Sequence, residues 1–153
     1  HLGGVAEIAN ATGSTVSEDL TVGLHPADLP LWEQKGGAGF FGMNVDPGPE
    51  PTLLFEHGQN LQVGDYIFQV RHAPGHTPGH VIFYCAEEKL LFSGDVLFQG
   101  SIGRTDLPGG DYDTLMKSIH KQILTLPDDV RVLAGHMGET TVGQERRENL
   151  YLR

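Results

Sequence analysis

The segment Pro74-Gly75-His76-Thr77-Pro78-Gly79-His80 constrains the fold more than any other part of this chain. It stands between two runs that are typical of strands: residues 66–71, which alternate apolar and polar side chains, and the apolar run 81–85. Two prolines and two glycines within seven residues predict a tight and rigid turn. Such a turn leaves the imidazole of His76 little freedom, which is how a metal ligand has to be held.

Composition predicts one folded domain over residues 1–153. The length suffices to bury a core, and 39% hydrophobic with 20% charged residues argues against disorder. A formal net charge of −10 with ten Lys and Arg argues against nucleic acid and against an anionic membrane surface as partners. No apolar run approaches the roughly 20 residues of a membrane span. The single cysteine, Cys85, indicates a reducing compartment, so we expect a cytoplasmic protein; no oligomeric state follows from the sequence.

The pattern of elements predicts an α/β protein, with strands in the middle of the sequence and helices on either side. Helices are expected over 4–11, 26–35 and 141–150, and a further helix, capped by Asp111 or Asp113, carries apolar residues on one face as far as Leu124. Strands are expected over 20–24, 52–56, 66–71, 81–85, 89–92 and 130–133. The Gly- and Pro-rich stretches 36–51 and 94–110 are expected to be loops.

Two candidate metal ligands come just after expected strands. Asp95 follows the strand 89–92, His136 follows the strand 130–133, and each is preceded by a glycine. With His76 and His1 they supply three imidazoles and one carboxylate, a ligand set that zinc prefers and that iron or manganese can also use. A carboxylate can bridge two cations, and two metals about 3.5–4 Å apart can hold a hydroxide and polarise a substrate carbonyl.

These motifs give the chain a resemblance to a known family. The segments 1–4, 74–80, 93–95, 100–106 and 134–136 resemble those of metallo-β-lactamase-fold hydrolases of the short, single-domain, glyoxalase-II-like (hydroxyacylglutathione hydrolase-like) kind. The resemblance covers residues 1–152 and implies a four-layer αβ/βα sandwich. His1 matches the last histidine of the family motif H-x-H-x-D-H. The resemblance therefore implies a chain truncated at its N-terminus, with the first strands and three further ligands upstream.

The resemblance also implies a role for each candidate residue. His76 would bind the first metal, Asp95 would bridge both metals and serve catalysis, and His1 and His136 would bind the second metal. The cofactors would be two divalent ions, zinc in the first place, with iron or manganese as alternatives. His80 would either support these ligands from behind or form hydrogen bonds within its own turn.

The reaction implied by the resemblance is hydrolysis of a small-molecule thiolester, in which a metal-bridging hydroxide attacks the carbonyl carbon and a thiolate leaves. Arg104 stands where family members often place a basic residue that contacts the thiol carrier. Alternatively, Arg104 pairs with Asp106 or Asp111 and pins its loop. An iron-dependent persulfide dioxygenase, which shares the fold and a segment like 103–106, is a second interpretation. A third is a catalytically incomplete fragment, because the chain begins within a ligand motif at His1.

Overall fold

The computed structural model describes residues 4–11 and 21–153, except for the side chains of Phe40 and Phe41. The chain forms two compact units, His1–Phe55 and Glu56–Arg153. The elements of the first unit are α1 (Val5–Ala11), β1 (Gly23–Leu24), η2 (Pro26–Asp28), α2 (Leu29–Glu33), η3 (Lys35–Phe41) and β2 (Leu53–Leu54).

The first unit confirms the helix expected over 4–11 and most of the helix expected over 26–35. Pro26 starts η2 in its first turn, and the Nδ1 atom of His25 accepts a hydrogen bond from the backbone N–H of Ala27 at 3.2 Å. The expected strand 52–56 is reduced to the two residues of β2, which pair in parallel with β1. The expectation of a plain loop over 36–51 is wrong at its start, because η3 occupies the first part of that stretch.

The second unit is built on a mixed sheet with strand order β10-β9-β6-β5-β4-β3. Neighbouring strands are antiparallel except β6 and β9, which are parallel. A short hairpin of β7 and β8 follows β6. The strands are β3 (Asn60–Val63), β4 (Tyr66–His72), β5 (Val81–Cys85), β6 (Leu90–Gly94), β7 (Leu97–Phe98), β8 (Ser101–Ile102), β9 (Arg131–Ala134) and β10 (Thr140–Thr141).

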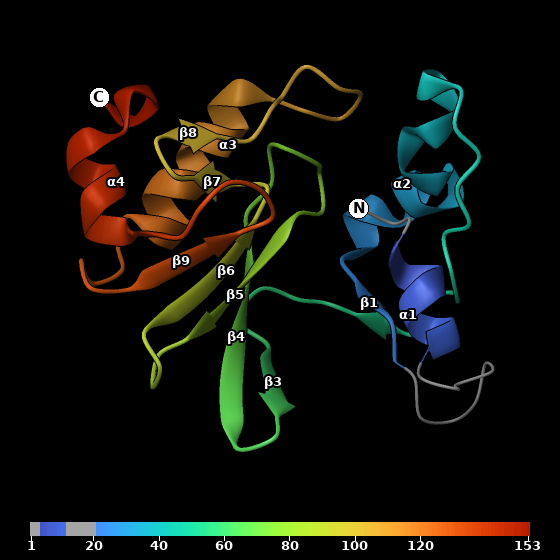
Figure 1. Cartoon of the computed structure of the whole chain (residues 1–153), viewed down its shortest axis with the longest axis horizontal. Helices are drawn as coiled ribbons and strands as arrows, with labels where there is room; N and C mark the ends of the chain where they lie inside the picture. The colour runs from blue at the N-terminus through green and yellow to red at the C-terminus, as the bar shows by residue number, and fades with distance from the viewer. Residues whose placement is uncertain (1–3, 12–20) are drawn as a thin grey trace. The chain divides into compact units, whose positions relative to one another are not determined.

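Helices cover one face of this sheet at its β9 end. The helix α3 (Tyr112–Ser118) continues into a π-helical segment η4 (Ile119–Ile123), and α4 (Val142–Glu148) is followed by η5 (Leu150–Leu152). The core joins the apolar stripe of α3 and η4 to the sheet through fully buried side chains such as Leu115, Ile119, Ile82, Leu91 and Val132. Figure 1 shows α3 and α4 beside β9 and β6, whereas the β3–β4 hairpin extends beyond both helices.

The turn between β4 and β5 is fastened to α3. The backbone N–H of Asp111 donates to the carbonyl oxygen of Gly75 at 2.8 Å, and the Ser118 hydroxyl donates to the carbonyl oxygen of Pro74 at 2.7 Å. Gly75 has a φ of +133° and lies against the backbone of Leu115. The turn that carries His76 is therefore held by a helix whose apolar side is part of the core.

The pattern of the sequence located most of the sheet. The strand expected over 81–85 is β5 residue for residue, and the strands expected over 66–71, 89–92 and 130–133 are β4, β6 and β9 within two residues. Asp111 caps α3, as one of the two expected residues, by accepting a hydrogen bond from the N–H of Thr114. The loop expected over 94–110 is wrong in part, because it contains β7 and β8. In the part of the chain that is described, no helix is long and apolar enough to cross a bilayer.

Gly75→Ala should lower the free energy of unfolding of the chain by ~2–4 kcal/mol, because its Cβ would overlap the backbone of Leu115 and its φ is closed to L-residues. Urea denaturation measures this loss. Gly64→Ala is the matched control: its φ is +59°, a Cβ there meets nothing within 4 Å, and the expected loss is only ~1 kcal/mol. Equal losses in the two variants would contradict the close packing of the turn on Leu115.

Candidate metal centre

The parallel pairing of β6 with β9 brings two of the candidate ligands together. Gly94 lies opposite Ala134, and the N–H of Gly135 donates to the carbonyl oxygen of Gly94 at 2.8 Å. The residues that follow, Asp95 and His136, therefore leave the same edge of the sheet. Their side chains approach each other, with 3.4 Å between the Oδ2 atom of Asp95 and the Nε2 atom of His136.

His76 reaches the same carboxylate oxygen from the turn between β4 and β5. Its Nε2 atom lies 3.7 Å from Oδ2 of Asp95, and its Nδ1 atom lies 2.9 Å from the carbonyl oxygen of Arg104. A carbonyl oxygen only accepts hydrogen bonds, so Nδ1 must carry the proton. A neutral His76 then turns the lone pair of Nε2 towards Asp95, and two acceptors in this position call for a proton or a cation between them.

His80 supports the main chain of Asp95. The backbone N–H of Asp95 points at the Nε2 atom of His80 with a separation of 3.3 Å, and the rings of His80 and His76 meet edge to face with 5.6 Å between their centroids. Of the two roles considered for His80, support from behind the candidate ligands is the one that this contact favours. The backbone of His80, in contrast, belongs to its own turn through a bond to Thr77.

The carboxylate of Asp95 is enclosed on one side and open on another. A Cβ atom on Gly135 would overlap its Oδ1 atom, and a Cβ atom on Gly103 would overlap its backbone carbonyl oxygen. The side chain of Asp95 is 8% exposed, whereas that of His136 is 57% exposed. The group of three side chains is therefore closed behind Asp95 and accessible at His136, where the ring of Phe98 packs edge to face at 5.9 Å.

Arg104 takes part through both its main chain and its side chain. Its guanidinium donates two hydrogen bonds to the carboxylate of Asp106, at 2.8 and 2.7 Å, while its carbonyl oxygen contacts His76. The hydrogen bonds from Arg104 lower the pKa of the Asp106 carboxyl from its ordinary 3.8 to about 2, and the same pair raises the pKa of Arg104. The expected pairing of Arg104 with Asp106 is present in the structure; a contact with substrate stays a prediction.

The chemistry of this donor set fits a metal, although the set is incomplete. No group of three or more His, Cys, Asp or Glu side chains in residues 4–11 and 21–153 forms a ready metal-binding cluster. Neighbouring ligands of a tetrahedral zinc, with bonds of about 2.0–2.1 Å, lie about 3.3 Å apart. The separations of 3.4 and 3.7 Å around Asp95 are close to that value. His1, the fourth expected ligand, lies outside the described residues.

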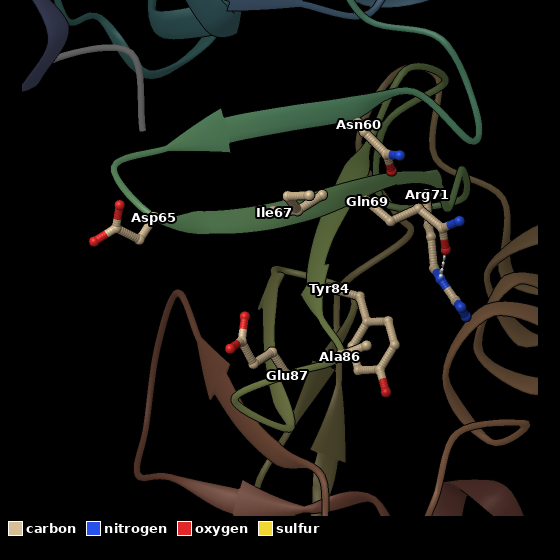
Figure 2. Close-up of a pocket in the computed structure, with 8 residues that line it drawn as sticks. All are labelled: Asn60, Asp65, Ile67, Gln69, Arg71, Tyr84, Ala86 and Glu87. Carbon is tan, nitrogen blue, oxygen red and sulfur yellow. Dashed lines mark hydrogen bonds between the residues drawn. The ribbon is translucent and has the colours of Figure 1, made fainter.

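A hollow of about 510 Å³ lies apart from these side chains, on β3, β4 and β5. Its lining, drawn in Figure 2, is Asn60, Asp65, Ile67, Gln69, Arg71, Tyr84, Ala86 and Glu87. Arg71 bonds to Gln69 and to the carbonyl oxygen of Gln122, and its guanidinium lies 4.9 Å from the centre of the Tyr84 ring. Burial lowers the pKa of Arg71. These contacts join the sheet to η4, and the lining includes none of His76, Asp95 and His136.

Two supporting residues escaped the sequence analysis. Ser118 and Glu145 are polar and buried, and both bond to segments that carry candidate ligands. Glu145 shares one face of α4 with Val142 and Asn149, at the spacing i, i+3 and i+7 that marks a buried helical face. Glu145 could have been found in the sequence from this signal: a charged residue at a helix position that the spacing assigns to the core.

Comparison with known proteins shows that most of the chain matches one protein family. The model of the Metallo-beta-lactamase superfamily matches residues 1–136. Hydroxyacylglutathione hydrolase GloC of Haemophilus influenzae is 48% identical over 113 residues, which make up 73% of this chain and 53% of that protein. The chain thus spans about half the length of that relative.

Two solved structures extend the likeness over nearly the whole chain. TTHA1623, crystallised in a di-iron-bound form, is 44% identical with a TM-score of 0.84, covering 99% of this chain and 72% of that one. ETHE1 from Myxococcus xanthus is 26% identical with a TM-score of 0.66, covering 95% and 70%. These likenesses confirm the metallo-β-lactamase fold that the sequence motifs implied.

The Arg104–Asp106 pair can be tested by titration, without any metal. Because the pKa of Asp106 is lowered to about 2, the stability that the pair contributes is present above pH 3.8 and lost as the pH falls through 2. An NMR pH titration of the Asp106 carboxyl should show a midpoint near 2, and in Arg104→Ala a midpoint raised towards the ordinary value of 3.8. Asp129, whose pKa is lowered by Lys89, is the internal control. An unchanged Asp106 midpoint in Arg104→Ala would rule out the pair.

Proposed function

This chain belongs to the metallo-beta-lactamase superfamily, and on that basis we propose that it carries part or all of the centre of a metal-dependent hydrolase. The proposed ligands are His1, His76, Asp95 and His136, and the proposed cofactors are two divalent ions, zinc in the first place. A di-iron form of a relative supports iron as the alternative. The observation that carries the proposal is the single carboxylate oxygen of Asp95 faced by two imidazole nitrogens.

The described residues hold the proposed ligands in position and set which nitrogen of His76 carries the proton. A metal pair held here would supply hydroxide at neutral pH and polarise a carbonyl oxygen. Arg104 fixes the proton of His76 on Nδ1, so that Nε2 is available as a ligand. The Oδ2 atom of Asp95 faces the imidazoles of both His76 and His136. The backbone N–H of Asp95 is held by a hydrogen bond to His80. The exposed imidazole of His136 leaves the open side of the centre accessible to a substrate.

A thiolester is the proposed substrate class. The support is the likeness to GloC, whose name describes hydrolysis of hydroxyacylglutathione. We propose that Arg104, with a side chain 54% exposed, contacts the anionic thiol carrier. Its guanidinium is already bound to Asp106, so the contact would use the remaining N–H groups or replace that partner.

An iron-dependent sulfur dioxygenase is the second candidate. The presence of iron in the TTHA1623 structure and the likeness to ETHE1 are compatible with it, whereas the two irons of TTHA1623 match the metal count proposed for the hydrolase. Metal analysis and two assays separate the candidates. Two metals per chain with hydrolysis of a hydroxyacyl-glutathione thiolester support the hydrolase, whereas one iron per chain with oxygen consumption on a persulfide supports the dioxygenase.

His76→Ala should abolish thiolester hydrolysis and lower the affinity for zinc at least 10-fold, because it removes one proposed ligand. The free energy of unfolding of the metal-free chain should change by less than ~1 kcal/mol, because the turn is held by its backbone bonds to α3. Zinc titration, a thiolester assay and urea denaturation measure the three quantities.

His120→Ala is the matched control, since it removes an exposed imidazole from η4 in the same unit. It should retain parental zinc affinity and turnover. Parental zinc affinity in His76→Ala would contradict the proposed centre.

A further inference from the structure

The carboxylate of Glu145 is buried in the second unit, with the residue 1% exposed. It accepts three hydrogen bonds: from the N–H of Gly100 at 2.9 Å, from the hydroxyl of Thr140 at 2.6 Å and from the side-chain amide of Asn149 at 2.8 Å. All three donors are neutral. A buried carboxylate in such a network depends on each of its donors, because losing one leaves an unsatisfied charged group.

Two of these donors belong to segments that follow candidate ligands. Gly100 lies at the tip of the β7–β8 hairpin, five residues after Asp95. Thr140 begins β10, four residues after His136. The Asn149 amide also donates to the carbonyl oxygen of Ser101, so it adds a second attachment of α4 to the same hairpin. The side chain of Glu145 thus connects the segment that follows Asp95 to the segment that follows His136.

The hairpin and the loop after His136 also touch each other directly. The Phe98 ring packs on the imidazole of His136, and a Cβ on Gly138 would lie 2.8 Å from the side-chain oxygen of Gln99. Met137, between His136 and Gly138 in this loop, has a φ of +65°, a left-handed conformation that costs energy for a residue with a side chain. The loop is therefore held in place by its surroundings rather than by its own preference.

We propose that Glu145 is a positioning residue of the metal centre, which sets the separation of Asp95 and His136 by clamping the β7–β8 hairpin to the loop after His136. The inference rests on the proposed function for its metal readout, but the placement of the His136 ring is independent of any metal. A role in the stability of the fold alone explains less well why a carboxylate is buried at position 145. Val142 and the core around it are apolar, and a buried carboxylate gives a fold little or no net stability over an apolar side chain.

Glu145→Met tests the clamp, because methionine keeps about the length and volume of the side chain but accepts none of the three hydrogen bonds. A glutamine would not break the network, because its amide could accept from Gly100 and Asn149 and donate to the Thr140 hydroxyl. We expect a 10- to 100-fold weaker affinity for zinc. Glu148→Met makes the same chemical change at an exposed position of α4 and should leave zinc affinity unchanged. Ile123→Val, a core variant that bonds to no candidate ligand, controls for lost stability and should alter zinc affinity less than twofold at a comparable fall in Tm.

A second readout uses the metal-free full chain. The ring protons of His136 should be shifted by the ring current of Phe98 in the parent chain, and this NMR shift should be lost in Glu145→Met but kept in Glu148→Met and Ile123→Val. A retained shift together with zinc affinity equal to that of Ile123→Val would overturn the proposal. A lost shift in a chain that binds no zinc even as the parent would uphold the clamp and refute the proposed function instead.

Substitution of Thr140 keeps the test decisive if Glu145→Met does not fold. Thr140→Val removes one of the three donors at nearly constant volume, and Thr140→Ser retains its hydroxyl. The valine variant should lose both the His136 shift and zinc affinity, and the serine variant should restore them. Equal behaviour of the two variants would show that the hydrogen bond to Glu145 does not position the ligand.

Discussion

The parallel pairing of β6 with β9 is the contact on which the candidate centre depends. In an antiparallel pair, the residues after two neighbouring strands leave opposite edges of the sheet; in a parallel pair, they leave the same edge. Asp95 and His136 are 41 positions apart in sequence and meet only because β6 and β9 run in the same direction. A parallel pair needs a long connection between its strands, and α3 with η4 provides it.

The same connection also fixes the third side chain. Leu115 and Ile119 bury one face of α3 and η4 against the sheet, while Asp111 and Ser118 bind the backbone of the turn before His76. His76 therefore cannot move away from Asp95 unless the helix moves, and the helix cannot move without opening the core. Rigidity of the centre is thus a consequence of core packing, in addition to the prolines and glycines of the turn itself.

The parts of the fold with a local signal could be predicted from the sequence. β5 is an apolar run bounded by turn residues, and Asp111 is an N-cap residue ahead of an apolar stripe. β3 does carry the alternation of a strand, with Asn60 and Gln62 between apolar residues, but over four residues the pattern is too short to stand out. β7 and β8 have two residues each and pair with each other across Gln99 and Gly100, and the hairpin is held from outside by Glu145, far away in sequence. Two residues are too few to show the alternation of a strand. Nothing in residues 94–110 alone reveals them.

The candidate site also has a part that could be predicted from the sequence and a part that could not. His76, Asp95 and His136 were predicted as a group from the residues that precede them, and their side chains lie together in the structure; their role as ligands stays a prediction. His1 lies outside the described residues. The pairing of Arg104 was one of two alternatives, and its carbonyl bond to His76 could not be predicted, because a backbone group leaves no mark on the sequence.

The two buried carboxylates of the second unit show how the fold distinguishes support from chemistry. Glu145 accepts hydrogen bonds from three neutral donors, so both of its carboxylate oxygens are satisfied within the protein. On Asp95, Oδ2 instead faces the imidazoles of His76 and His136, and the tautomer of His76 turns a lone pair towards it. Such a site gains from a bound cation, whereas the site around Glu145 gains nothing. This contrast in hydrogen-bond partners, at similar burial, supports Asp95 rather than Glu145 as a proposed metal ligand.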